Sequence, residues 1–131
     1  LMDIIKITPD KERAKSILKM TSLIEERIKM QNRAKMTALI ITDYYEIIKE
    51  LITAVLLLDG YKTLNHKDLI DYIKKYSEFS SYEISLLDDL RILRNRVTYE
   101  GFFVDFSYLD KNERLFKEII KKLKNFVNKK I

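Results

Sequence analysis

The fold is decided by the stretch TALIITDYYEIIKELITAVLLLDG, Thr37 to Gly60. At about 100° per residue, its apolar side chains fall on one broad helical stripe. Gly60 supplies the left-handed conformation that ends such a helix near Asp59. The stripe is wider than one packing face requires, so part of it is expected to meet a partner. Its members are Thr37, Ile40, Ile41, Tyr44, Ile48, Leu51, Val55 and Leu58, and Tyr45, Ile52 and Leu56 widen it.

The residues before this stretch carry the signals of an earlier helix. Thr8, Pro9 and Asp10 supply a capping hydroxyl, a ring that presets the first helical dihedral and an acid for the positively polarised first turn. A helix is therefore expected from about Pro9 to near Lys29. The polar segment KMQNRAK, residues 29–35, is expected to form a turn before the second helix.

Further capping signals divide the second half of the chain. Asn65 is expected to cap a short helix over residues 66–76. Ser80 with a glutamate three positions later is a capping box, which opens a fourth helix. That helix should reach about Tyr99 before Gly101 ends it.

The terminal helix is predicted to begin where Asp110 and Glu113 repeat the capping signature, after the connecting segment FFVDFSYLD, residues 102–110. With only two glycines and one proline in 131 residues, long helices are expected and strands are not. The length suits one domain over residues 1–131. The expected fold class is all-α: an antiparallel up-and-down bundle of about five helices, a four-helix core plus a short helix.

Composition excludes several classes of function. The chain has no cysteine and one histidine, so no metal site is expected and no cofactor is indicated. The longest apolar run, residues 51–58, is far below the roughly 20 residues that cross a bilayer, so no membrane partner is expected. Residues 1–10 show neither a basic leader nor a cleavage pattern, and a cytoplasmic location is the expectation.

The net charge of +5 has an uneven distribution. Residues 111–131 hold eight Lys or Arg against two Glu, and the first 110 residues sum to −1. Lysines in the last turns of a terminal helix offset the negative end of its dipole. The excess of basic residues in this terminal segment therefore favours a solvated helix end over a surface that binds nucleic acid.

The segment LRILRNRVTYEG, Leu90 to Gly101, has a polar face that the core does not need. Leu86, Leu90, Leu93 and Val97 form its packing stripe, and three of the seven arginines of the chain lie between positions 91 and 96. A planar guanidinium binds carboxylate or phosphate through two hydrogen bonds, which lysine does not match. The candidate phosphate-binding residues are Arg91, Arg94, Asn95 and Thr98.

A row of acids on the second helix offers a counterpart to these arginines. Asp43, Glu46 and Glu50 lie one turn apart and would repel one another without nearby cations. In one interpretation, they pair with Arg91 or Arg94 and fix the bundle. In the other, they only orient the arginines, which bind a phosphate group.

These residues resemble the HEPN superfamily (higher eukaryotes and prokaryotes nucleotide-binding). The pattern LRxLRNRVxYxG is carried by residues 90–101, and residues 43–73 are similar to the second and third helices of small archaeal and bacterial members. In that family an Arg followed by His four to six residues later forms a metal-independent ribonuclease site built by two protomers. The resemblance makes Arg94, Asn95 and Tyr99 the catalytic candidates, with Tyr99 in the place of the histidine.

The replacement of histidine by Tyr99 changes the chemistry that this position can perform. Tyrosine has a reference pKa near 10, so it serves as a proton donor or a stacking surface rather than as a base. The resemblance also implies a small nucleotidyltransferase partner, as in toxin–antitoxin pairs. The tyrosine that such a partner modifies corresponds here to Gly101.

Three functions follow as hypotheses. The first is a nucleotide- or RNA-phosphate-binding protein that works beside a small nucleotidyltransferase. The second is a metal-independent endoribonuclease, and the third is a structural adaptor without nucleotide binding. A homodimer is expected, through the extra apolar width of the second helix and the neighbourhood of the fourth.

The single histidine and the other aromatic side chains are expected to have structural roles. His66 is expected to serve turn hydrogen bonding or packing, since nothing in the sequence directs it toward Arg94. Tyr44 and Tyr45 are expected to be core or dimer contacts. The three phenylalanines of the connecting segment are expected to seat it against the bundle, because exposed aromatic rings are a liability. They are Phe102, Phe103 and Phe106.

Overall fold

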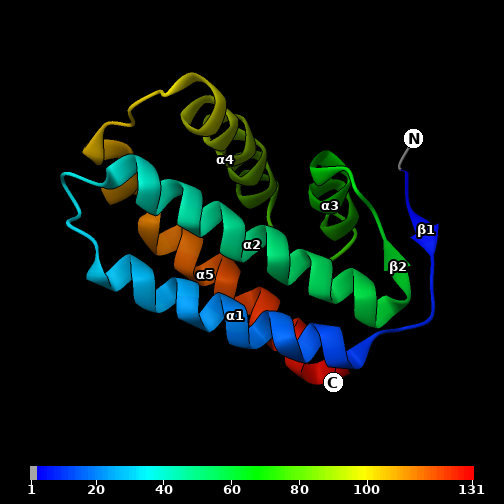
Figure 1. Ribbon diagram of the computed structural model, residues 1–131. Coiled ribbons are helices and arrows are strands. Elements are labelled where there is room, and N and C mark those ends of the chain that lie inside the picture. The colour runs from blue at the N-terminus through cyan, green and yellow to red at the C-terminus, as the bar shows by residue number, and fades with distance from the viewer. Residues whose placement is uncertain (1–2) are drawn as a thin grey trace.

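The computed structural model describes residues 3–131 and is an all-α bundle of five helices with one two-stranded sheet (Figure 1). This confirms the expected fold class. Leu1 and Met2, which belong to the segment used for the expectation about export, lie outside the described residues. Across residues 3–131, every helix is too short or too polar to cross a bilayer. The elements are β1 (Ile5–Lys6), α1 (Lys11–Met30), α2 (Thr37–Asp59), β2 (Tyr61–Lys62), α3 (His66–Ile73), α4 (Ser81–Glu100) and α5 (Phe106–Lys130).

The second helix, α2, forms the centre of the bundle, and α1, α3, α4 and α5 all pack against it (Figure 1). The residues that widen its apolar stripe are inside the protein: Tyr45 is 3%, Ile52 1% and Leu56 1% exposed. Helices of the same chain therefore cover these three residues, while Leu58 at the end of the stripe is half-buried. The three residues leave little apolar surface for a second copy, and the expected dimer contact through α2 stays a prediction.

Four predicted helix ends are confirmed. Gly60 and Gly101 end α2 and α4 with φ angles of 87° and 64°, the left-handed region that favours glycine. Asn65 accepts a hydrogen bond from the Lys67 amide at 2.9 Å and caps α3. Ser80 forms the predicted capping box at the start of α4. The third helix ends at Ile73, earlier than expected, and a turn follows.

The start of α1 is close to its predicted place but uses another cap. Asp10, rather than Thr8, accepts a hydrogen bond from the Arg13 amide, at 3.0 Å. The carboxylate thus satisfies one of the unpaired amides of the first turn. The hydroxyl of Thr8 is too far before Lys11, where the helix begins.

The start of α5 lies earlier than the predicted capping signature. Asp105 accepts a hydrogen bond from a backbone amide of the first turn at 2.8 Å, and the helix begins at Phe106. Asp110 and Glu113 therefore lie inside the helix. The earlier start places Leu109 on the packed face, where it is fully buried, and this burial favours the longer helix.

A short antiparallel sheet, which the sequence did not predict, joins the N-terminal segment to the end of α2. Ile5 pairs with Lys62 and Lys6 with Tyr61. Beyond the sheet, the Ile7 amide donates to the Gly60 carbonyl oxygen at 2.8 Å. A Cβ atom at position 60 would lie 3.0 Å from the Ile7 carbonyl oxygen, so the glycine allows this close approach as well as the turn.

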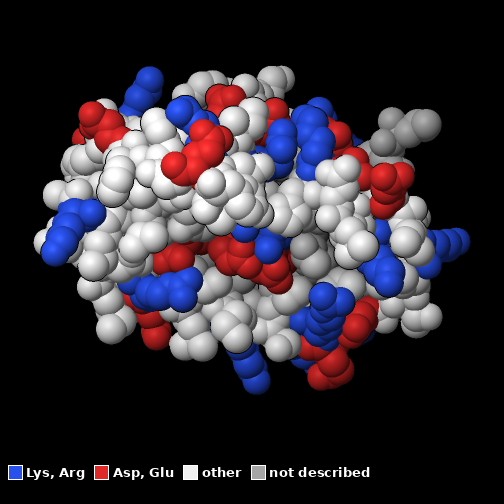
Figure 2. All heavy atoms as spheres, turned by 45° about the horizontal axis from the view of Figure 1, so that its top comes forward, with Lys and Arg blue, Asp and Glu red and all other residues white. Residues whose placement is uncertain are grey.

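The basic tail is partly neutralised by the bundle. Lys122 donates to both carboxylate oxygens of Glu83 at 2.9 Å, and Lys130 donates to Asp59 at 2.7 Å. On the face shown in Figure 2, acidic and basic side chains are interspersed rather than gathered into one basic patch. The candidate site is therefore defined by its local arrangement rather than by the net charge.

Candidate functional site

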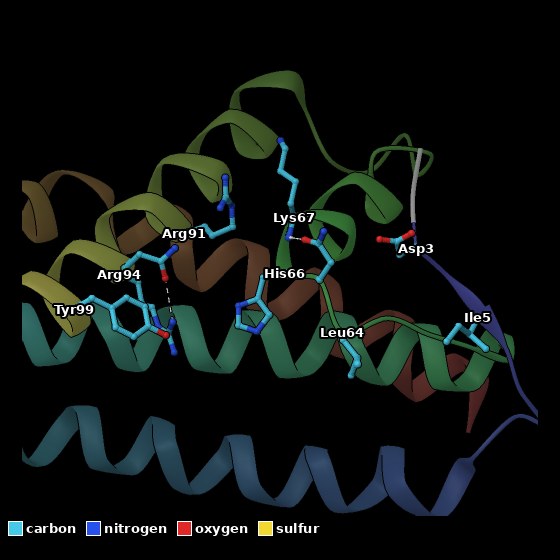
Figure 3. A pocket seen from close by; sticks show the side chains of 10 residues that line it. Asp3, Ile5, Leu64, His66, Lys67, Arg91, Arg94 and Tyr99 are labelled. Carbon is cyan, nitrogen blue, oxygen red and sulfur yellow. Dashed lines mark hydrogen bonds between the residues drawn. The ribbon is translucent and has the colours of Figure 1, made fainter.

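A pocket of about 680 Å³ lies where the start of α3 faces the C-terminal half of α4 (Figure 3). Both helices rest on α2, and the N-terminal segment closes the far end. The pocket brings together four of the residues singled out on α4 with a basic and an aromatic side chain of α3. It is lined by Asp3, Ile5, Leu64, Asn65, His66, Lys67, Arg91, Arg94, Asn95 and Tyr99.

The packing of α4 explains why its polar side chains point into this pocket. Leu86 and Leu90 are 6% and 0% exposed and hold the helix against the core. Residues one position further along the helix are rotated by about 100°. Arg91 and Arg94 therefore flank the buried stripe and reach the pocket (Figure 3).

Arg94 keeps most of its hydrogen-bonding capacity free. Its Nη1 donates to Asn95 Oδ1 at 3.1 Å, and within residues 3–131 it forms no ion pair with a carboxylate. Its Cζ lies 5.6 Å from the ring centre of Tyr45 and 5.9 Å from that of Tyr99. Two aromatic rings thus position the guanidinium, and its remaining N–H groups are available to an anion.

Arg91 and Lys67 are held by an acid that the sequence interpretation missed. Asp88 accepts from Arg91 Nη2 at 3.2 Å and from Lys67 Nζ at 3.2 Å. Burial raises the pKa of Asp88, but the hydrogen bonds and charges of the two cations outweigh it and lower the pKa below its ordinary value. Asp88 and Arg91 lie three residues apart on one helix, and this spacing could have predicted their contact from the sequence.

The acids of α2 do not contact the arginines of α4, contrary to expectation. Asp43 accepts from Arg27 at 2.7 and 3.1 Å and from Gln31 at 2.7 Å. This places its carboxylate on the side of α1. Glu46 and Glu50 both pair with a lysine of their own helix, Lys49, at 3.0 and 3.2 Å. None of the three acids orients Arg91 or Arg94 by direct contact.

The two predicted residues at the end of α4 differ in their placement. Thr98 is exposed and does not line the pocket. Tyr99 lines it and is 75% exposed. In the described part of the chain the Tyr99 hydroxyl has no hydrogen-bond partner from another helix, so the ring is a wall of the pocket rather than an interhelical link.

His66 lies in the same pocket as Arg94, which the sequence gave no reason to expect. Its Nδ1 is 3.2 Å from the hydroxyl of Tyr45, and the two rings lie 6.0 Å apart. Burial lowers the pKa of His66, and the charges of Lys49, Arg94 and Arg91 lower it further. The imidazole is therefore neutral at pH 7. His66 and Arg94 lie on different helices, so only the packing of α3 and α4 on α2 brings them together.

The other aromatic side chains divide into buried and exposed sets. Tyr44 and Tyr45 are each 3% exposed, which confirms that they are core contacts. Phe102 lies under the guanidinium of Arg96, whose Cζ is 3.8 Å from the ring centre. Phe103 is 85% and Phe106 39% exposed, so the expectation that all three phenylalanines seat the connecting segment is wrong. Val104 of the same segment packs against the core.

Two findings concern the kind of site and its relation to known proteins. Within residues 3–131, no three His, Asp or Glu side chains gather in an arrangement that could hold a metal ion. No protein-family model matches this chain, and no curated protein matches it. The likeness to the HEPN superfamily therefore rests on the sequence pattern of residues 90–101 and 43–73 and enters the proposal below.

Proposed function

We propose that the protein binds the phosphate group of a nucleotide or of RNA in the pocket between α3 and α4. The observation that carries the proposal is the guanidinium of Arg94, which lines an open pocket and forms no ion pair with a carboxylate of residues 3–131. Such a group is costly to leave without an anionic partner when it is partly buried. A phosphate oxygen pair matches its fork geometry.

The other lining groups support a nucleotide over a simple anion. Arg91 and Lys67 add two further cations, and Asn95 supplies an amide. The exposed ring of Tyr99 beside Arg94 offers a stacking surface for a base, a contact worth about 1–3 kcal/mol in single-stranded nucleic-acid complexes. Charge, fork geometry and an aromatic face thus lie within one pocket.

The resemblance of α4 to the HEPN pattern supports a biological setting for this binding. Such proteins work with a small nucleotidyltransferase in toxin–antitoxin-type pairs, and we propose the same kind of partner here. A neighbouring reading frame with a glycine-serine and paired-aspartate pattern would support the pairing. A neighbourhood without such a frame would favour a protein that binds phosphate alone.

The binding proposal is tested by calorimetric titration with adenosine 5′-monophosphate (AMP) and with a short oligouridylate. We expect saturable binding of both, which weakens as salt rises because phosphate contacts release counterions. The structural-adaptor hypothesis expects no binding of either probe. Heat signals that do not saturate would count against the proposal and in favour of the adaptor.

The competing function is a metal-independent endoribonuclease, and the imidazole of His66 in the pocket is the observation that favours it. In that reaction the ribose 2′-oxygen attacks the adjacent phosphorus, the 5′-oxygen leaves with a proton, and a 2′,3′-cyclic phosphate forms. This hypothesis predicts cleavage of oligouridylate in EDTA that is lost on Arg94→Ala. Intact RNA after incubation with concentrated native protein would rule it out.

We propose a homodimer through the junction of α4 and α5. The exposed Phe103 lies beside an apolar groove of about 440 Å³ that the same segment helps to form. A twofold axis close to this junction would bring the ring of each copy onto the groove of the other. Arg96 and Asp105 also line the groove, so the surface carries both charges and is self-complementary.

Phe103→Asp is expected to raise the dissociation constant of the dimer by about 30-fold, because an aromatic anchor is replaced by a charge. Sedimentation velocity over a concentration series measures the change. Met30→Asp is the matched control, since Met30 is equally exposed, at 85%, but lies at the end of α1. A monomeric native protein, or equal weakening by both variants, would contradict this interface.

A further inference from the structure

The hydroxyl of Tyr45 has a single hydrogen-bond partner among residues 3–131, which is Nδ1 of His66 at 3.2 Å. Tyr45 is 3% exposed, so water offers little alternative. Burial raises the pKa of this phenol to about 12, and the hydroxyl therefore keeps its proton. A buried hydroxyl proton without an acceptor is costly. The Tyr45 hydroxyl must consequently donate to Nδ1.

This donation fixes where the imidazole carries its own proton. A neutral imidazole has one N–H donor and one acceptor nitrogen. Because Nδ1 accepts the hydrogen bond from Tyr45, the ring proton of His66 resides on Nε2. Nε2 has no hydrogen-bond partner within the described residues, yet it is not among their buried polar atoms that lack such a partner. Nε2–H is therefore open to solvent, on a residue that lines the pocket.

The charges around His66 keep it in this neutral form. A second proton on Nδ1 would break the hydrogen bond that this nitrogen accepts from Tyr45 and would add a positive charge beside Lys49, Arg91 and Arg94. Among the charges that act most strongly on the ring, Glu46 acts in the opposite direction. The titratable and charged groups that act on the ring are Tyr45, Glu46 and Lys49 of α2 and Arg91 and Arg94 of α4. Asp3, Lys67 and Tyr99 line the same pocket.

We propose that His66 is a phosphate-binding residue that donates its Nε2–H to a phosphate oxygen held by Arg94, and that Tyr45 is the positioning residue that sets this tautomer. The inference rests on the proposed binding function and names the ligand class more closely: a phosphate monoester or diester whose oxygens face a guanidinium and a neutral imidazole together.

The same tautomer argues against His66 as a general base. A general base must present a lone pair to the ribose 2′-hydroxyl, whereas Nε2 presents a hydrogen. Taking up a second proton would require Nδ1 to lose its bond from Tyr45. The imidazole in this pocket therefore supports binding of RNA phosphate without cleavage.

The tautomer is measured directly because the chain has a single histidine. A long-range nitrogen–proton correlation spectrum of ¹⁵N-labelled protein reports only this ring. We expect the Nε2–H tautomer at pH 7, and a titration midpoint below the ordinary value of 6.5. In Tyr45→Phe we expect a mixture of tautomers and a midpoint closer to 6.5. A structural role for Tyr45 alone would leave the tautomer unchanged.

Two variants test the contact with the ligand. In His66→Gln, the side-chain amide nitrogen reaches the position of Nε2, whereas in His66→Asn it reaches only the position of Nδ1. His66→Asn is expected to lower the affinity for AMP by about tenfold, the worth of one hydrogen bond to a charged group. His66→Gln should restore most of that loss. Thermal unfolding of both variants checks that they fold.

The outcomes separate this inference from the proposed function. An Nδ1–H tautomer in a protein that binds AMP overturns the role of His66 and leaves the binding function standing. A native protein that binds neither AMP nor oligouridylate overturns the binding function, and with it the ligand assigned to His66. Cleavage of oligouridylate in EDTA that disappears in His66→Gln would make the imidazole a base and overturn the inference.

Discussion

Arg94→Ala is expected to lower the affinity of the protein for AMP by about 100-fold, or about 3 kcal/mol of binding free energy. The guanidinium lines the pocket, and within residues 3–131 its only hydrogen-bond partner is Asn95. Its loss removes two charge-assisted hydrogen bonds to the phosphate at once. Calorimetric titration of native and variant protein at one salt concentration measures the difference.

The control for this variant lies two residues further along the same helix. Arg96 is exposed and rests on the ring of Phe102, and it does not line the pocket. Arg96→Ala removes the same charge and is expected to change the affinity by less than about threefold, because exposed charges act weakly at a distance. Equal losses in both variants would mean that the arginines attract phosphate only through net charge.

Asp59→Ala is expected to lower the free energy of unfolding by about 3 kcal/mol. The Asp59 carboxylate accepts from Tyr72 at 2.6 Å, from Tyr76 at 3.0 Å and from Lys130 at 2.7 Å. It therefore ties the end of α2 to α3, to the turn after α3 and to the last turn of α5. Its removal leaves two hydroxyls and an ammonium without their acceptor. Chemical denaturation monitored by circular dichroism measures the loss.

The pH dependence of stability provides a second test of the same carboxylate. Burial raises the pKa of Asp59, but the hydrogen bonds from Lys130, Tyr72 and Tyr76 outweigh burial and lower the pKa below 3.8. The native carboxylate thus contributes stability above pH 3.8, and this contribution is lost as the pH falls through the lower folded-state value. Asp59→Ala should flatten this acid limb. Asp110→Ala, on the exposed side of α5, should leave it unchanged.

The sequence predicted four of the helix ends because these signals are local. A capping side chain or a left-handed glycine acts within one turn, so Asn65, Ser80, Gly60 and Gly101 could be read without neighbours. The prediction failed for α5, which is capped by Asp105 and not by the signature of Asp110 and Glu113. Burial of Leu109 favoured the earlier start, and burial is not a local property.

The sequence also identified the face of α4 that forms the pocket. Arg91, Arg94 and Asn95 line it, because helical periodicity separates them from the buried leucines. Tyr99, which the resemblance to the HEPN pattern singled out, lines it beside them. Thr98 lies within the same arc but is exposed and does not line the pocket. The position of an arc around one helix is predictable, whereas the choice of which members line a pocket depends on what packs beside the helix.

The sequence by itself determined the class of fold, the positions of four helix ends and the side chains that α4 presents. Only the tertiary structure decided which groups meet them. It turned Asp43 toward α1, placed Asp88 between Arg91 and Lys67, and brought His66 beside Arg94. The physical reason is that periodicity fixes directions around one helix axis, while the distance between two helices depends on how both pack against a third, which here is α2.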